Sequence, residues 1–330
     1  MTALLEARHV TKIFGGGGIF DRTKGNVALD DFSLAINSEP PSITAVVGES
    51  GSGKTTLARI MLGLISPTNG EVLYRGKDLR KLSGAERHQF LRDVQVIFQD
   101  PYEVYNPFYR VDHVLETPIA KFKLAKSKQA ARDLMVETLE AVGLRTEETL
   151  GRFPHQLSGG QRQRIMVARA LLLRPRLIIA DEPVSMVDAS LRATILDSLR
   201  KLNQDFGISI IYITHDLTTA YQISDNIIVM YRGAVAEAGD VNLVVKEPHH
   251  PYTQLLVGSV PLPDPDRLWR QEVILTEEQR ASVTPLSCKF ADRCPHTMPM
   301  CLEKHPPLYQ TNPRRAAACY LYRDSVAMKS

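Results

Sequence analysis

The chain has 330 residues, a formal net charge of +3 at pH 7 and 44% hydrophobic residues. This length can form one large α/β domain with a smaller appendage, and the composition is that of a folded protein with a core. Acidic and basic residues are mixed throughout, which excludes the concentrated basic surface of a nucleic-acid-binding protein. No apolar run approaches the roughly 20 residues that span a bilayer, and no signal-peptide pattern opens the chain. We therefore expect a cytosolic protein.

The first elements in chain order are strands that lead to a glycine-rich loop. Residues 4–14 and 29–36 predict two antiparallel strands, separated by four consecutive glycines and a polar loop. The apolar, β-branched segment 43–47 predicts a third strand. It runs into the sequence Gly48-Glu49-Ser50-Gly51-Ser52-Gly53-Lys54-Thr55, and residues 56–64 predict a helix directly afterwards.

This loop has the composition of a phosphate-binding site. Glycines let consecutive N–H groups converge on phosphate oxygens, and the following helix presents its N-terminus to them. Lys54 would reach the β- and γ-phosphates, and the Thr55 hydroxyl would bind Mg²⁺. The alternative, a glycine turn with a surface lysine, does not explain the flanking strand and helix. We predict that ATP is bound by Gly48, Ser50, Gly51, Gly53, Lys54, Thr55 and Thr56.

Residues 70–74 and 94–98 predict further strands. Residues 177–180, 208–214 and 227–230 predict short buried strands of a parallel sheet that alternate with helices. An amphipathic helix is predicted over residues 126–142, with Gly143 placed to end it.

Polar side chains follow three of these strands, where α/β sheets place ligand groups. Asp181 and Glu182 follow residues 177–180, and we assign Asp181 to Mg²⁺ and Glu182 to the general base that polarises the attacking water. Gln99 and His215 follow the strands at 94–98 and 208–214. Alone, an acidic turn, a glutamine after a strand or a buried structural histidine would also fit these positions.

A second glycine-rich segment, Leu157-Ser158-Gly159-Gly160-Gln161, precedes another predicted helix. Ser158 and the N–H groups of Gly159 and Gly160 would point at an anion, helped by the helix dipole. A capped helix would explain Ser158 but not the two glycines. One nucleotide site needs only one phosphate cradle, whereas two chains placed head to tail would use both.

Together, these motifs resemble the ATP-binding-cassette (ABC) ATPases over residues 4–260. The resemblance implies a P-loop NTPase of the α/β class, with a RecA-like parallel sheet core, an antiparallel β subdomain and a helical subdomain over about residues 100–170. It implies that Gln99 senses Mg²⁺ and the attacking water while its loop contacts a membrane subunit, and that His215 holds the γ-phosphate. The residues expected to contact ATP on the opposite subunit are Ser158, Gly159, Gly160, Gln161 and Asp188.

The loop at residues 185–188 departs from the usual family pattern at two apolar positions. Residues 185–188 are Ser-Met-Val-Asp, whereas the common family form is Ser-Ala-Leu-Asp. We therefore expect the dimer contact through Asp188 to be kept, with its details altered. Phe14 lies where an aromatic residue, commonly tyrosine, stacks on adenine. A buried core phenylalanine is the alternative at this position.

All four cysteines fall near the C-terminus, at Cys288, Cys294, Cys301 and Cys319. In a reducing compartment, such a cluster favours metal or iron–sulfur ligation over disulfides. Structural zinc sites prefer closer ligand pairs than these gaps of 5, 6 and 17 residues, but zinc and free thiols stay open as alternatives.

The proline-rich segment 248–266 predicts a linker, which gives a cassette over 1–247 and an extension over 248–330.

The C-terminal sequence narrows the resemblance to one group of ABC ATPases. His250-Pro251-Tyr252-Thr253-Gln254-Leu255-Leu256, the segment 260–265 and the cysteine pattern resemble the ATPases of oligopeptide/dipeptide importers over nearly the whole chain. In that family the cysteines can hold a [4Fe–4S] cluster, with Zn²⁺ as the less favoured occupant. The glycine-rich insertion at 15–27 resembles the second of the two ATPase subunits, which implies a heterodimer.

The resemblance implies an ATPase at the cytoplasmic face of the inner membrane, bound peripherally to two transmembrane permease subunits. An extracytoplasmic solute-binding protein would deliver the oligopeptide or dipeptide cargo. Oligosaccharides or nickel are the alternative cargoes, and a soluble ABC ATPase without transport is the alternative from another class. Because every predicted nucleotide residue precedes residue 216, we expect the cysteine-containing tail to take no part in hydrolysis.

Overall fold

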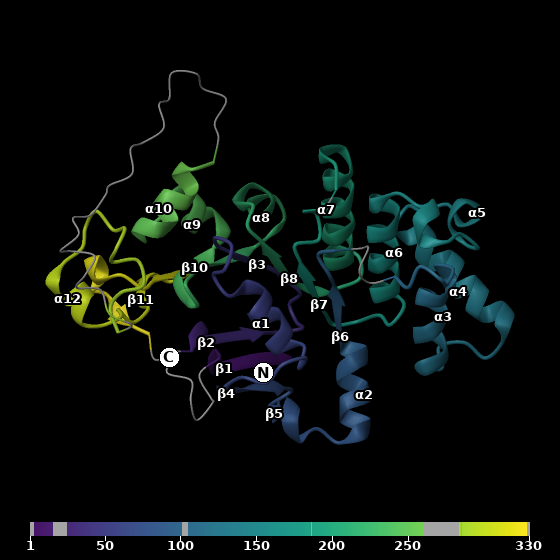
Figure 1. Cartoon of the computed structure of the whole chain (residues 1–330), viewed down its shortest axis with the longest axis horizontal. Helices are drawn as coiled ribbons and strands as arrows, with labels where there is room; N and C mark the ends of the chain where they lie inside the picture. The colour runs from purple at the N-terminus through teal and green to yellow at the C-terminus, as the bar shows by residue number, and fades with distance from the viewer. Residues whose placement is uncertain are drawn as a thin grey trace. The chain divides into compact units, whose positions relative to one another are not determined.

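The structure is a computed structural model that describes residues 3–15, 25–100, 105–185, 187–260, 284 and 286–328. The chain divides into two compact units. The first, here the helical unit, comprises Met1–Leu4, Ile36–Ile43 and Tyr74–Ile213; the second, here the phosphate-loop unit, comprises Leu5–Ala35, Thr44–Leu73 and Thr214–Ser330. Figure 1 labels their helices and strands.

The phosphate-loop unit contains two groups of strands. One has the order β2-β1-β4 and is formed by β1 (Leu5–Phe14), β2 (Asn26–Ile36) and β4 (Asn69–Tyr74). The other begins with β3 (Ile43–Val47), which pairs in parallel with β9 (Asn226–Tyr231). All five residues of β3 are buried, as expected for a strand covered on both faces. Helix α1 (Lys54–Met61) follows β3 and buries Leu57 and Ile60.

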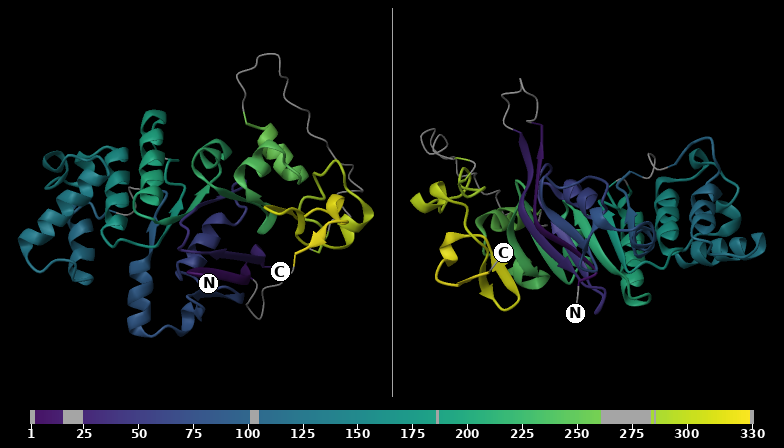
Figure 2. Two further views of the ribbon diagram at one scale, coloured as in Figure 1. Left: turned by 180° about the vertical axis from the view of Figure 1, so that it is seen from behind. Right: turned by 90° about the horizontal axis from the view of Figure 1, so that it is seen from below.

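The C-terminal tail extends this second group of strands. Strand β9 pairs antiparallel with β10 (Ala234–Asp240), which pairs antiparallel with β12 (Arg315–Ala317), so that Glu237 lies opposite Ala317. Strands β11 (Tyr309–Asn312) and β13 (Val326–Ala327) continue the order. Figure 2 shows this yellow segment beside β10 in both views. The remaining elements are α8 (Leu217–Ile223), α9 (Val241–Lys246), α10 (Pro251–Gly258), α12 (Pro299–Glu303) and the 3₁₀ turn η3 (Tyr320–Tyr322).

The helical unit contains three parallel strands in the order β8-β7-β6, namely β6 (Val94–Ile97), β7 (Leu177–Asp181) and β8 (Ser209–Thr214). Their register places Ile97 opposite Ala180, and Asp181 opposite Ile213. The other elements are β5 (Lys77–Asp78), η1 (Leu79–Lys81), α2 (Gly84–Asp93), α3 (Asp112–Lys121), α4 (Lys128–Ala141), α5 (Thr146–Thr149), η2 (Pro154–Gln156), α6 (Gly159–Leu171) and α7 (Ala189–Gln204). Helices α3, α4 and α6 pack against one another.

Most predicted elements lie where the sequence places them, and three differ in ways that concern the site. Helix α1 begins at Lys54, so Lys54 and Thr55 belong to its first turn. Strand β7 runs through Asp181. The prediction of a linker over residues 248–266 is wrong for its first part, because residues 251–258 form α10 and Tyr252 and Thr253 are buried. Residues 261–266 and residues 16–24 of the glycine-rich insertion lie outside the described residues.

No helix among the residues that the structure describes is long and apolar enough to cross a membrane.

Candidate nucleotide site and cysteine pocket

The phosphate loop joins the buried strand β3 to α1 and depends on glycine backbone conformations. Gly51 and Gly53 have φ angles of +81° and +102°, in the left-handed region that favours glycine. A Cβ atom on Gly53 would lie 2.3 Å from the carbonyl oxygen of Ala28, so a side chain there would collide with backbone. These two constraints explain why the loop carries glycines at these positions.

Lys54 is buried, and its ammonium group is held by the loop itself. Nζ donates to the carbonyl oxygens of Gly48 at 2.7 Å and Glu49 at 2.9 Å, and lies 3.4 Å from Ser52 Oγ. The positive charge therefore sits at the centre of the loop, beside the N-terminus of α1. The side chain of Thr55 is exposed at the start of the same helix, where its hydroxyl can reach a bound ligand.

Glu49 connects the loop to the C-terminal tail. Its N–H donates to Tyr252 Oη at 3.0 Å, and its carboxylate oxygens lie 3.1 and 3.2 Å from Arg293 Nη1. Sequence reasoning missed both partners, because separations of 203 and 244 residues leave no spacing signal. These contacts join the tail to the phosphate loop, while the absence of the tail from hydrolysis stays a prediction.

In the helical unit, Gln99 and Glu182 meet although 83 residues separate them in sequence. Their strands β6 and β7 are parallel neighbours, so both residues emerge at the same edge of the sheet. Gln99 Nε2 donates to Glu182 Oε2 at 3.1 Å, and Glu182 N–H donates to the carbonyl of Ile213 at 2.8 Å. Asp181, the last residue of β7, is buried beside them.

The signature segment forms the N-terminus of α6. Ser158 Oγ accepts from Gln161 N–H at 3.2 Å, and Gln161 Oε1 accepts from Ser158 N–H at 2.9 Å, which is a capping box. A Cβ on Gly160 would lie 2.5 Å from Leu191 Cδ1 of α7, so a side chain there would require Leu191 to shift. Ser158 is exposed, so the capped terminus faces solvent.

The remaining predicted residues are exposed. Asp188 lies before α7 and makes no capping bond with its side chain. His215 is exposed directly after β8, so it is not a buried structural histidine. Phe14 is 44% exposed, with the Lys12 ammonium 5.0 Å from its ring centroid, so it is not a core residue.

The predicted site residues are thus divided between the two units. Phe14, residues 48–56 and His215 belong to the phosphate-loop unit. Gln99, Asp181, Glu182, residues 158–161 and Asp188 belong to the helical unit.

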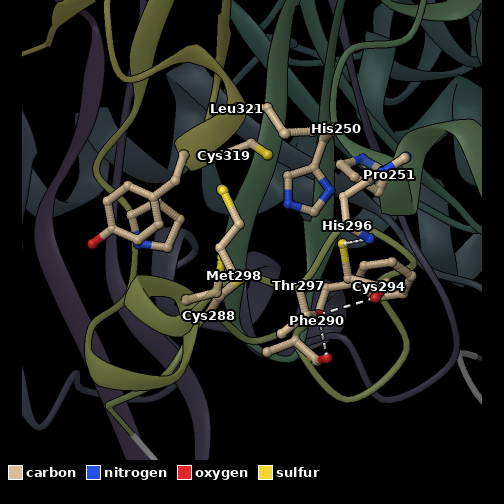
Figure 3. Close-up of a pocket in the computed structure, with 14 residues that line it drawn as sticks. His250, Pro251, Cys288, Phe290, Cys294, His296, Thr297, Met298, Cys319 and Leu321 are labelled. Atoms are coloured by element: carbon tan, nitrogen blue, oxygen red, sulfur yellow. Dashed lines mark hydrogen bonds between the residues drawn. The ribbon is translucent and has the colours of Figure 1, made fainter. Parts of the chain in front are cut away.

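The four cysteines, although dispersed over the tail, line a single pocket. Figure 3 shows Cys288, Cys294 and Cys319 around it, with His250 and Phe290 on its wall, and Cys301 also lines it. The N–H of Cys288 donates to the carbonyl of Cys301 at 2.7 Å, which joins two of the cysteine segments directly. All four thiols are free, and three of them are buried.

The pocket is apolar, and burial there favours the protonated form of Cys288, Cys294 and Cys319. Burial raises the pKa of Cys288 to about 12, and the neighbouring cysteines contribute smaller increases. Burial also raises the pKa of Cys319 to about 11 and that of Cys294 above its usual range. The cavity is only about 10 Å³, roughly the space of one water molecule.

The predicted cluster site is therefore matched in its residues but not in its geometry. Four thiols are the right donors for a [4Fe–4S] cluster. Within the described ranges, however, no group of three or more His, Cys, Asp or Glu side chains is arranged to hold a metal ion. Binding a cluster would require the cavity to widen.

Two family models and several known proteins match the sequence of this chain. A family model described as ABC transporter matches residues 29–185, and a model of the oligopeptide/dipeptide transporter C-terminal region matches residues 236–301. The oligopeptide transport ATP-binding protein OppF of Salmonella typhimurium is 41% identical over 83% of this chain and 82% of its own. The dipeptide transport ATP-binding protein DppF of Haemophilus influenzae is 37% identical over 97% of each chain.

A solved ATP-binding cassette is similar in structure to this chain. The dimeric structure of a post-hydrolysis state of the ATP-binding cassette MJ0796, bound to ADP and Pi, matches with a TM-score of 0.62 and 30% identity. The match covers 72% of this chain and 98% of that chain.

Proposed function

Because the chain belongs to the ATP-binding proteins of the oligopeptide/dipeptide ABC transporters, we propose that its ATPase activity drives the uptake of peptides through a membrane importer. The observation that carries this proposal is the combination, in one chain, of the cassette with the C-terminal region of those transporters. Oligosaccharides and nickel remain weaker candidates for the cargo, because the relatives described above are named for oligopeptides and dipeptides. A soluble ATPase without transport has no support from the tail region.

The phosphate loop would bind the triphosphate. Lys54 would exchange its bonds to the Gly48 and Glu49 carbonyls for the β- and γ-phosphates, and the other loop residues would donate N–H groups. The exposed ring of Phe14 is free to stack on adenine. Thr55, Gln99 and Asp181 carry the oxygen donors that Mg²⁺ prefers, and the ion would neutralise phosphate charge when bound.

Hydrolysis would then depend on the paired side chains in the helical unit. Glu182 would take the proton of the attacking water, and His215 would hold the γ-phosphate. The hydrogen bond from Gln99 would orient the carboxylate of Glu182 before water arrives.

The second anion site would act across a dimer. The N-terminus of α6 is exposed, and Ser158, Gly159, Gly160 and Gln161 would contact the γ-phosphate on a second, homologous ATPase subunit, with Asp188 alongside. The dimeric state of the similar cassette supports this arrangement. We propose a heterodimer, because the glycine-rich insertion resembles that of a second ATPase subunit.

The membrane partners would be two permease subunits, which place the chain peripherally on the cytoplasmic face of the membrane. The chain exposes an aromatic surface near the end of the Gln99 loop, where Phe108 is 87% exposed and Tyr109 52% exposed. We propose that this surface meets the permease. An extracytoplasmic solute-binding protein would deliver the cargo to the other side.

A reconstituted complex tests the function. The chain, its homologous ATPase and the two permease subunits are placed in proteoliposomes, and ATP hydrolysis is measured with the solute-binding protein and a candidate cargo. We expect an oligopeptide or dipeptide to stimulate hydrolysis, and an oligosaccharide or nickel to leave it at the basal rate. Stimulation by oligosaccharide or nickel alone would overturn the peptide assignment, and hydrolysis that never responds to the permease would favour a non-transport ATPase.

A second proposal concerns the pocket, because four free thiols converge on it. We propose that Cys288, Cys294, Cys301 and Cys319 hold a [4Fe–4S] cluster in the assembled protein. The cluster would join the tail segments covalently where a large apolar core is missing. Because the pKa of Cys288 is about 12, loading would release protons.

Anaerobically purified full-length chain tests the cluster directly. We expect brown protein with about four iron and four sulfide per chain. Colourless protein with one zinc per chain would overturn the cluster in favour of zinc. Colourless protein with neither metal would leave four free thiols.

A further inference from the structure

All three polar groups of Glu49 are engaged within the phosphate-loop unit. Its N–H donates to Tyr252 Oη, and its carboxylate pairs with Arg293. Its carbonyl oxygen accepts from Lys54 Nζ at 2.9 Å and from Ser52 N–H at 3.1 Å. The residue that supports the resting position of the phosphate-binding lysine is therefore also bonded to the C-terminal tail.

Tyr252 is a rigid partner for this contact. Its side chain is fully buried, and its ring centroid lies 4.4 Å from that of Tyr231 and 5.5 Å from that of Phe290. Its N–H donates to His250 Nδ1 at 3.0 Å, and the buried Glu237 carboxylate accepts from His250 N–H at 2.9 Å. With ring and backbone both held, the position of the hydroxyl is well defined.

Arg293 is held by the same aromatic group. Its guanidinium carbon lies 5.9 Å from the centroid of Tyr231 and 5.6 Å from that of Phe290, within cation–π range. Arg293 directly precedes Cys294, and its N–H donates to the carbonyl of Phe290. Phe290 and Cys294 both line the cysteine pocket, so the segment that forms the pocket wall also carries the contact to Glu49.

We propose that Tyr252 and Arg293 are positioning residues for ATP binding, which hold the phosphate loop through Glu49 from outside the cassette core. This inference rests on the proposed function only in that the loop binds ATP. It assigns a nucleotide-handling role to the tail, which the sequence suggested would be separate from the ATP site. We place neither side chain against the nucleotide; each acts on the phosphate loop through the position of Glu49.

Two variants of the full-length chain test the proposal. Tyr252→Phe removes the hydroxyl acceptor while keeping the buried ring, and we expect the Kd for ATP to rise about threefold to tenfold, the value of one hydrogen bond. Arg293→Gln breaks a partly exposed ion pair, so a smaller rise of about twofold to fivefold is expected. In the assembled ATPase, KM for ATP should rise in parallel, and kcat at saturating ATP should stay within about twofold of wild type, since uniform binding is what is lost.

An ion pair between the cassette and the tail supplies a matched control. Arg232 Nη2 pairs with Asp292, the residue before Arg293, at 2.8 Å and does not contact the Glu49 carboxylate. Arg232→Gln should therefore loosen the tail to a similar extent and leave the Kd for ATP unchanged. Arg293→Lys should recover part of the lost affinity, because a lysine can keep the charge pair with Glu49.

The Glu49→Gln background separates the two contacts. There, Arg293→Gln should have no further effect, whereas Tyr252→Phe should still weaken ATP binding, because Tyr252 contacts the backbone of residue 49. Wild-type ATP affinity in both single variants would overturn the inference, as would an equal loss in Arg232→Gln. Absence of ATP binding by the wild-type chain would instead contradict the proposed function.

Discussion

Hydrogen bonds hold both the carboxylate and the backbone of Glu182. Its φ angle of +45° is unusual for a residue with a side chain, and its N–H is bonded to the Ile213 carbonyl. Ser185 Oγ donates to its carbonyl at 3.0 Å, and Gln99 donates to its carboxylate. A strained backbone held by several bonds is common at catalytic positions.

The Glu182→Gln variant should keep ATP binding and lose hydrolysis. The amide preserves the shape of the side chain but cannot accept a proton, so phosphate release should fall at least about a hundredfold. Phosphate release in the assembled complex and nucleotide binding by the chain are the two measurements. Glu137→Gln, at an exposed position of α4, should behave like wild type. A fall of less than about tenfold in Glu182→Gln would remove Glu182 from the role of general base.

Lys54→Ala should lose nucleotide binding itself. A charged hydrogen bond contributes about 1.5–3 kcal/mol, so affinity for ATP should fall at least about tenfold. Titration with a fluorescent ATP analogue measures the loss. Lys77→Ala, which breaks an exposed ion pair with Glu86, is the control. Undiminished ATP binding in Lys54→Ala would refute the assignment of the phosphate loop.

At the scale of elements, local patterns predicted much of the fold. The apolar strand 43–47, the glycine loop and the following helix were predictable because each has a local signature. A parallel sheet was also predictable, but its strand order was not, and so the hydrogen bond from Gln99 to Glu182 comes from the structure alone. The helix at 251–258 was not predicted, because the prolines around it indicated a linker. Pro251 lies in the first helical turn and Pro248 precedes the helix, where proline does not interrupt it.

The N-terminus of α6 gives a prediction with a built-in control. Ser158→Arg should leave ATP binding by the isolated chain intact and block hydrolysis in the assembled complex, because we propose that the segment acts on the opposite subunit. The substitution also removes a helix cap, at a cost of about 1 kcal/mol. Ser83 forms the same capping box with Glu86 at the start of α2. Ser83→Arg should therefore cost similar stability, seen as the same change in Tm, while hydrolysis persists.

Loss of ATP binding by the isolated Ser158→Arg chain would place both glycine-rich segments in one site and contradict the dimer.

At the scale of the whole molecule, the sequence could not reveal which distant segments share a surface. The four cysteines are separated by gaps of 5, 6 and 17 residues, yet they line one pocket. Arg293 and Tyr252 reach Glu49 across more than half of the chain. Such contacts arise from tertiary packing, here the pairing of β12 with β10, and no local periodicity encodes them. The tail is thus part of the unit that holds the phosphate loop.

The account centres on a chain whose ATP hydrolysis drives peptide import, and vesicle uptake measures this directly. Proteoliposomes containing the chain, its homologous ATPase and the two permease subunits receive ATP on the cytoplasmic side and a labelled peptide with the binding protein on the other. We predict peptide accumulation that requires ATP and disappears with Glu182→Gln in this chain together with the equivalent change in its partner. Accumulation that persists at the wild-type rate with both variants, or ATP hydrolysis with no peptide accumulation, would contradict it.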